Sequence, residues 1–178
     1  AGYTDGNGDG FFDGIEFSLL YEQSAADIAN WAQIMKDGAA KAGIKINLTG
    51  LERNTYLARG REKDFDIYAG NWAVMEEPAA YLGLAYRTGG FINYASISDP
   101  DLEKLIDEAQ AATTPEAVKG PVQAAARLIS EKVYDNVLYY QTFQFAYNSD
   151  KWDGFVVQPS DLLSLVNPLS LASVKPKN

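Results

Sequence analysis

Residues 15–50 read IEFSLLYEQSAADIANWAQIMKDGAAKAGIKINLTG, and this stretch decides the predicted fold. It begins with a strand over residues 15–21, because residues 17–21, Phe-Ser-Leu-Leu-Tyr, read as a buried strand. A helix follows, with Ser24 as its predicted N-terminal cap and Gly43 as the residue that ends it. Alternating apolar and polar residues over 44–49 then predict a half-buried strand. The apolar face of the helix is formed by residues at three- and four-residue spacing: Ile28, Trp31, Met35, Ala39 and Ala42.

The same alternation of elements continues further along the chain. A shorter helix is predicted over residues 53–62 and a third strand over residues 65–69. Strands that alternate with helices favour an α/β fold, with a mixed, mainly parallel sheet flanked by helices. Ligands bind such sheets beyond the carboxyl ends of the strands, so the loop over residues 70–78 is the first expected ligand site.

The second half of the chain is predicted to be helical at first and rich in loops at its end. Residues 79–98 lack a regular pattern, and helices are expected to begin at Pro100 and Pro115. Pro121 should kink or delay the first turn of the second of these helices. Two strands are predicted over 137–140 and 143–147, and residues 175–178 form a frayed tail. Because no long linker divides the sequence, we expect residues 1–178 to form a single domain, or one lobe of a larger protein.

The composition excludes several classes of function. The chain has 15 basic and 24 acidic residues, a net charge of −9, which argues against nucleic acids and anionic membrane surfaces as partners. It has no cysteine and no histidine, which excludes thiol nucleophiles, disulfides and histidine-based triads. We therefore predict that the protein is not an enzyme. A hydrolase that uses Glu76 or Glu77 is the alternative, although adjacent loop carboxylates are usually just solvated.

Residues 5–16 match the calcium-loop pattern D-x-N-x-D-G-x₅-E position by position. Gly10 would allow the sharp turn, and Glu16 would bind with both carboxylate oxygens. We expect no required cofactor, but a structural calcium ion that raises the melting temperature. The alternative is a Gly/Asp-rich turn without metal, because calcium loops of this type lie between helices and no helix fits before Asp5. The predicted calcium ligands are Asp5, Asn7, Asp9, Phe11, Asp13 and Glu16.

Aromatic residues gather in the loops after the third predicted strand, among polar side chains such as Asn71 and Asn93. Flat rings with a few directional polar groups are typical of a small-molecule site. We interpret Trp72 as a ligand contact because of its place after a strand. Three other rings are interpreted as anchors for the irregular segment: Tyr81, Tyr86 and Phe91.

Across these segments, the chain resembles the extracellular solute-binding proteins of ABC importers, in the oligopeptide/dipeptide/nickel-binding family. The resemblance runs over nearly the whole chain, and its strength lies in the order and spacing of five segments. They are residues 1–10, residues 42–46, residues 65–68 with Trp72 and Pro78, residues 93–109, and residues 137–140.

The resemblance implies one lobe, the carboxy-terminal one, of a two-lobed periplasmic-binding-protein-like fold that closes on its ligand. The whole protein would be a monomer outside the membrane, periplasmic or extracellular, held by a lipid anchor upstream or free. It would carry a peptide or similar small solute to a membrane permease. A signalling or chaperone-like binding module on the same lobe is the alternative.

Peptide-binding members of that family hold the peptide's amino group with an acid three residues after the loop tryptophan. This chain has Met75 at that position, so Glu76 takes the role or the ligand lacks a free amine, which leaves a saccharide open. Nickel is not expected to be held directly, because the chain has neither imidazole nor thiolate. The predicted ligand-binding residues are Asn71, Trp72, Met75, Glu76, Asn93 and Tyr94.

Overall fold

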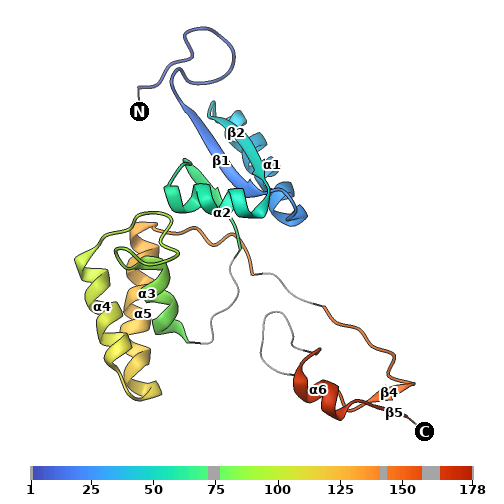
Figure 1. Cartoon of the computed structure of the whole chain (residues 1–178). Coiled ribbons are helices and arrows are strands. Elements are labelled where there is room, and N and C mark those ends of the chain that lie inside the picture. The colour runs from blue at the N-terminus through green and yellow to red at the C-terminus, as the bar shows by residue number, and fades with distance from the viewer. Residues whose placement is uncertain (1, 72–76, 141–143, 158–164, 178) are drawn as a thin grey trace.

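The computed structural model describes residues 2–71, 77–140, 144–157 and 165–177. Three parallel strands form the main sheet in the order β2-β1-β3, which confirms the predicted fold class. The central strand β1 (Glu16–Glu22) pairs along its whole length with β2 (Lys45–Leu51), and its second half pairs with β3 (Ile67–Ala69). The sheet and its two helices form one part of the molecule in Figure 1.

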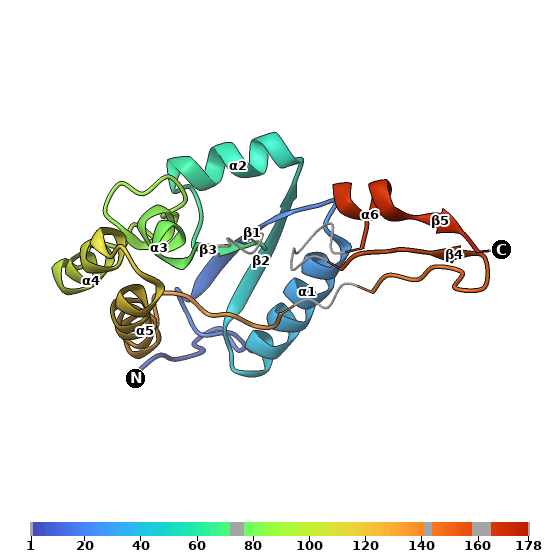
Figure 2. The same ribbon diagram turned by 90° about the horizontal axis from the view of Figure 1, so that it is seen from below.

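Two helices cover opposite faces of this sheet, as Figure 2 shows. On one face, helix α1 (Ala26–Lys41) packs Ile28 and Ala32 against the buried Leu19 of β1. Side chains alternate across a strand, so Leu20 and Tyr68 lie on the other face. That face is covered by α2 (Arg53–Glu62), whose bounds are those predicted from the sequence.

The ends of α1 differ in part from the prediction. The N-terminal cap is Ala25, which makes no side-chain hydrogen bond, and Ser24 instead donates its hydroxyl hydrogen to Glu22. The Ser24 prediction was wrong, because its hydroxyl bonds back to Glu22 in the preceding strand instead of forward to the first turn of α1. Gly43 does follow the helix, with a φ of 76°, a conformation that favours glycine. Met35, predicted for the apolar face, is exposed.

A second group of helices consists of α3 (Pro78–Tyr86), α4 (Pro100–Ala111) and α5 (Pro115–Lys132). Their shared core includes Leu82, Leu102 and Ile106. Each helix begins with proline directly after a capping residue, and the predicted starts at Pro100 and Pro115 are confirmed. Helix α3 was missed, because residues 79–98 show no helical period. Helix α5 also continues through Pro121, so that residue does not delay its start.

The last third of the chain differs most from the prediction. Residues 137–140 and 144–147 are not strands, and residue 143 lies outside the described part. Instead, β4 (Trp152–Asp153) pairs with β5 (Lys175–Pro176) in a small antiparallel sheet beside α6 (Pro168–Ser173). The tail predicted to fray is therefore paired at Lys175 and Pro176.

Within the residues that the structure describes, no helix is both long and apolar enough to cross a lipid bilayer.

Candidate ligand site at the strand ends

The strand order places a topological switch point between β1 and β3. β1 connects through α1 to β2 on one side of it, and β2 connects through α2 to β3 on the other side of β1. A crevice beyond the carboxyl ends of two such strands is where open α/β sheets bind their ligands. In this chain the strand ends are Glu22, Leu51 and Ala69.

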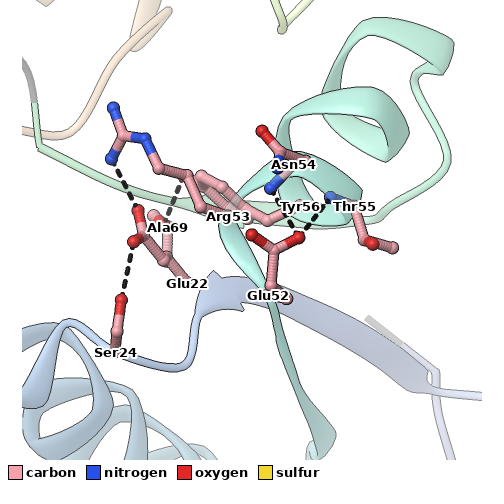
Figure 3. A network of polar contacts seen from close by, with 8 residues as sticks. All are labelled: Glu22, Ser24, Glu52, Arg53, Asn54, Thr55, Tyr56 and Ala69. Carbon is pink, nitrogen blue, oxygen red and sulfur yellow. Dashed lines mark hydrogen bonds and ion pairs between the residues drawn. The ribbon is translucent and has the colours of Figure 1, made fainter.

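Glu22 is the centre of a polar network at these strand ends (Figure 3). One of its carboxylate oxygens accepts a hydrogen bond of 2.7 Å from the Ser24 hydroxyl. The other accepts from Nη1 of Arg53 at 3.0 Å. The Glu22 side chain is 17% exposed and that of Arg53 is 68% exposed. The network therefore joins the loop after β1 to the start of α2 and leaves a guanidinium facing solvent.

The start of α2 is held in place by two further contacts (Figure 3). Glu52 caps the helix by accepting from the backbone N–H groups of Asn54 and Thr55. The hydroxyl of Tyr56 donates to the carbonyl oxygen of Ala69 at 2.9 Å. Because Ala69 is the last residue of β3, this bond ties α2 to the end of that strand.

A row of tyrosines lies on the face of the sheet that α2 covers. The Tyr68 ring lies 4.6 Å, between centroids, from the rings of both Tyr56 and Tyr94. Burial raises the pKa of Tyr56 to about 12, and it also raises the pKa of Tyr68. Both phenols therefore stay protonated near neutral pH and serve as neutral hydrogen-bonding groups.

The predicted ligand-binding residues fall into two groups. Trp72, Met75 and Glu76 lie outside the described residues. Asn71 is exposed, two residues after the end of β3.

Asn93 and Tyr94 are both buried in this structure. The Asn93 amide donates to the carbonyl oxygens of Arg87 and Ile97, and its oxygen accepts from the Ile97 N–H. These bonds hold the loop between α3 and α4 together. The Tyr94 ring packs on Tyr68, and Nζ of Lys63 lies 5.7 Å from its centroid. Their role as ligand contacts stays a prediction, as does that of the other four residues.

The predicted calcium loop is an ordered turn. The Asp5 carboxylate accepts hydrogen bonds from the backbone N–H groups of Gly8, Asp9 and Gly10. Glu16 pairs with Lys45 on β2 at 3.1 Å. The other predicted ligands also lie in this turn: Asn7, Phe11 and Asp13.

No group of three or more acidic residues among the described residues lies where it could hold a metal ion. The calcium ion stays a prediction, with a fold-stabilising turn as its alternative.

Sequence reasoning did not single out Glu22, Arg53 or Tyr56 for the site. One signal was present, because all three follow predicted strands within a few residues, where α/β folds place ligand contacts. What the sequence could not give is the contact between Glu22 and Arg53, which are 31 positions apart.

The model of one protein family, described as "Bacterial extracellular solute-binding proteins, family 5 Middle", matches residues 1–93. Among curated proteins, the chain is 29% identical over 132 residues to "Probable di/tripeptide-binding protein 5" of Pseudomonas aeruginosa (strain UCBPP-PA14). That match covers 72% of this chain and 25% of the relative. The chain therefore spans about a quarter of the length of the curated relatives it matches.

Solved structures show the same fold. A mannohexaose-bound periplasmic oligopeptide-binding protein of an ABC transporter from Thermotoga maritima matches with a TM-score of 0.76 at 16% identity. It covers 99% of this chain, and the match takes up 37% of that chain. A nickel ABC transporter protein from Bacillus halodurans matches with a TM-score of 0.62 at 25% identity, over 75% of this chain and 28% of its own.

Proposed function

Because this chain belongs to the bacterial extracellular solute-binding proteins of family 5, we propose that it is part of the substrate-binding component of an ABC importer. The whole protein would capture a peptide or similar small solute outside the membrane and deliver it to a permease. It would catalyse no reaction, since its work is recognition and release. The family match over residues 1–93 is the observation that carries this proposal, because those residues include the whole parallel sheet.

The geometry of the sheet supports a binding role. Its switch point carries hydrogen-bonding side chains at the ends of β1 and β3 and at the start of α2. A site that also needs a second lobe would bury the ligand between two faces when the lobes close. One face alone would bind weakly, because the ligand would lose its translational and rotational freedom and make only part of its contacts in return.

Peptide is the substrate class that we propose first. The Pseudomonas relative is called a di/tripeptide-binding protein, and it is similar over most of this chain. A saccharide is the second candidate, because the Thermotoga protein, which matches almost the whole chain in fold, is described as bound to mannohexaose. Direct coordination of nickel is not proposed, because the chain has no histidine and no cysteine.

The test is to identify the solute that the intact protein carries. The protein is purified from its native host without unfolding, and the bound fraction is released and analysed by mass spectrometry. We expect short peptides that rebind to protein stripped by unfolding and refolding. Mannohexaose is titrated in parallel as the rival ligand.

Recovery of oligosaccharides alone would replace peptide with saccharide. If no solute of either class co-purifies or rebinds, the transport proposal fails and a non-transport binding or signalling module gains support. Permease and ATPase genes beside the gene for this protein would count for the importer, and their absence would count against it.

A further inference from the structure

The Arg53 guanidinium lies at the ends of the strands, and the proposed function does not yet assign it a role. We propose that Arg53, held by Glu22, is a specificity-determining residue that receives a carboxylate of the ligand. This inference rests on the proposed function, since it concerns the ligand of that same site. It predicts that the protein discriminates between solutes that carry a carboxylate and neutral solutes of the same shape.

The position of Arg53 is the first argument. It is the first residue of α2, two residues after the end of β2, and its side chain reaches Glu22 at the end of β1 (Figure 3). Tyr56, one turn later in α2, binds the last carbonyl of β3. Arg53 thus contacts the end of β1, and its helix is tied to the end of β3, beside the crevice where the ligand is expected.

The hydrogen-bonding capacity of the guanidinium is the second argument. Arginine has five N–H donors in a planar fork, and the contact with Glu22 is made through Nη1. Glu22 is the partner of this guanidinium among the residues that the structure describes. With 68% of its side chain exposed, Arg53 can offer further donors to a second carboxylate in the paired geometry that these groups favour.

The electrostatic setting is the third argument. A cation in the first turn of a helix faces the positive end of the helix dipole, so helix stability does not explain this residue. The Glu52 carboxylate already accepts from two N–H groups at this end of α2, so a bound anion would be held by the guanidinium itself. The N-terminus of α1, at the same edge of the sheet, has no side-chain cap at Ala25. The net charge of −9 repels anions in general, so an anionic ligand needs a positively charged donor such as Arg53.

The role of Glu22 follows from its two hydrogen bonds. Its side chain is 17% exposed, and its carboxylate accepts bonds from both Ser24 and Arg53. Glu22 thereby restricts a long and otherwise mobile side chain to one orientation. A pre-oriented guanidinium loses less conformational freedom when the ligand binds.

A chemical double-mutant cycle on the intact protein tests the inference. The ligands are trialanine, trialanine amide, and Ala-Glu-Ala amide with an acetylated N-terminus. The last peptide carries its only carboxylate on a side chain, so it distinguishes that source from a chain terminus. Each is titrated by calorimetry into the wild-type protein, Arg53→Gln and Arg53→Lys.

The matched control is Lys104→Gln, which removes one exposed positive charge from α4, outside the sheet. Thermal melting verifies that each variant is folded.

We expect Arg53→Gln to weaken trialanine binding about tenfold or more and to leave trialanine amide within about twofold, as for a charged hydrogen bond. Arg53→Lys should restore only part of the loss, and Lys104→Gln should change neither ligand. If Arg53→Gln weakens the binding of the acetylated Ala-Glu-Ala amide and not that of trialanine, the result supports the site with a side-chain carboxylate as its ligand.

Two results would overturn the inference in distinguishable ways. If the wild type binds trialanine and its amide equally and Arg53→Gln changes neither, Arg53 receives no carboxylate, although the proposed transport function stands. If the wild type binds none of the three peptides, the peptide assignment fails and the inference falls with it.

Discussion

At the scale of single residues, glycines set how closely the tyrosines of the sheet can pack. A β-carbon added at Gly60 in α2 would lie 2.6 Å from Cε2 of Tyr68, and one added at Gly70 would lie 2.6 Å from the Tyr56 hydroxyl. The Tyr68 ring has little room to move, because the rings of Tyr56 and Tyr94 pack against it.

We predict that Gly60→Ala destabilises the protein despite its better helix propensity. Alanine in a helix gains about 1 kcal/mol over glycine. Overpacking a tight site costs about 1–3 kcal/mol, and here the neighbouring ring cannot yield. The net loss in the free energy of unfolding should be about 1 kcal/mol, measured by urea denaturation.

Gly38→Ala is the matched control for this prediction. Gly38 lies in α1 and is exposed, and a β-carbon there would meet nothing within 4 Å. The same substitution should therefore stabilise the protein by about 0.5–1 kcal/mol. If both variants gain stability to the same extent, the packing at Tyr68 is looser than the distances indicate.

Asn93 illustrates what a sequence cannot tell about a single residue. Its place among aromatic residues after a strand favoured a ligand contact. In the structure its amide makes three hydrogen bonds within one loop. The sequence could not show these loop bonds, and the role of Asn93 as a ligand contact stays a prediction.

At the scale of secondary structure elements, Asp99 joins the ends of α4 and α5. Its carboxylate caps α4 and accepts a 2.8 Å hydrogen bond from the hydroxyl of Tyr134, just after α5. The Tyr134 hydroxyl and the N–H groups of the cap lower the pKa of Asp99 below its ordinary value of 3.8. The folded state therefore favours the charged form of this carboxylate.

This lowered pKa gives a prediction for acid stability. Because the folded-state pKa is lower than the unfolded one, the contribution of Asp99 is full above pH 3.8 and is lost as the pH falls through the folded-state pKa. Asp99→Asn keeps one oxygen for the cap, replaces the oxygen that accepts from Tyr134 with an NH2 group, and cannot titrate. We expect the variant to be less stable at pH 7 and to lose less stability than the wild type between pH 5 and pH 2.

Thermal melting of both proteins across this pH range measures the effect. Asp101→Asn is the control, because Asp101 lies in the same turn and is exposed. Parallel melting curves for the wild type and Asp99→Asn at all pH values would contradict the assigned role of Asp99.

The elements that could be predicted are those with local signals. Helix α2 and the starts of α4 and α5 follow from spacing, capping residues and proline at the first position. The strands expected over 137–140 and 143–147 had the right composition, but a strand also needs a neighbour to pair with. Composition cannot show whether a partner strand for these residues lies within this chain.

At the scale of the whole molecule, the segment after α5 leaves its apolar side chains in solvent. It runs from the helices past α1, where the Tyr139 hydroxyl donates to Asp27, and on to the unit of β4, β5 and α6 (Figure 1). Tyr140 is 86% exposed, and most of its apolar neighbours are also exposed: Val137, Leu138, Tyr139, Phe145, Tyr147 and Val157.

Exposed apolar stretches of this length are typical of surfaces that another part of a protein covers. The Thermotoga structure matches 99% of this chain, yet the match takes up only 37% of that chain, so most of that protein has no counterpart here. We expect the remainder of the intact protein to cover this segment. The single-domain prediction for residues 1–178 would then apply to a lobe that depends on its neighbour.

The 178-residue polypeptide should therefore behave differently from the intact protein. Alone, it should bind the dye ANS and self-associate with rising concentration in light scattering, because the apolar segment is open to water. Leu138→Asn with Tyr140→Asn should reduce both effects without unfolding the chain, since both side chains are exposed.

In the intact protein the same double substitution should lower the melting temperature, because it places polar groups in a covered interface. A polypeptide that stays monomeric and free of dye, with an intact protein indifferent to the substitutions, would show that the segment is an ordinary solvated surface.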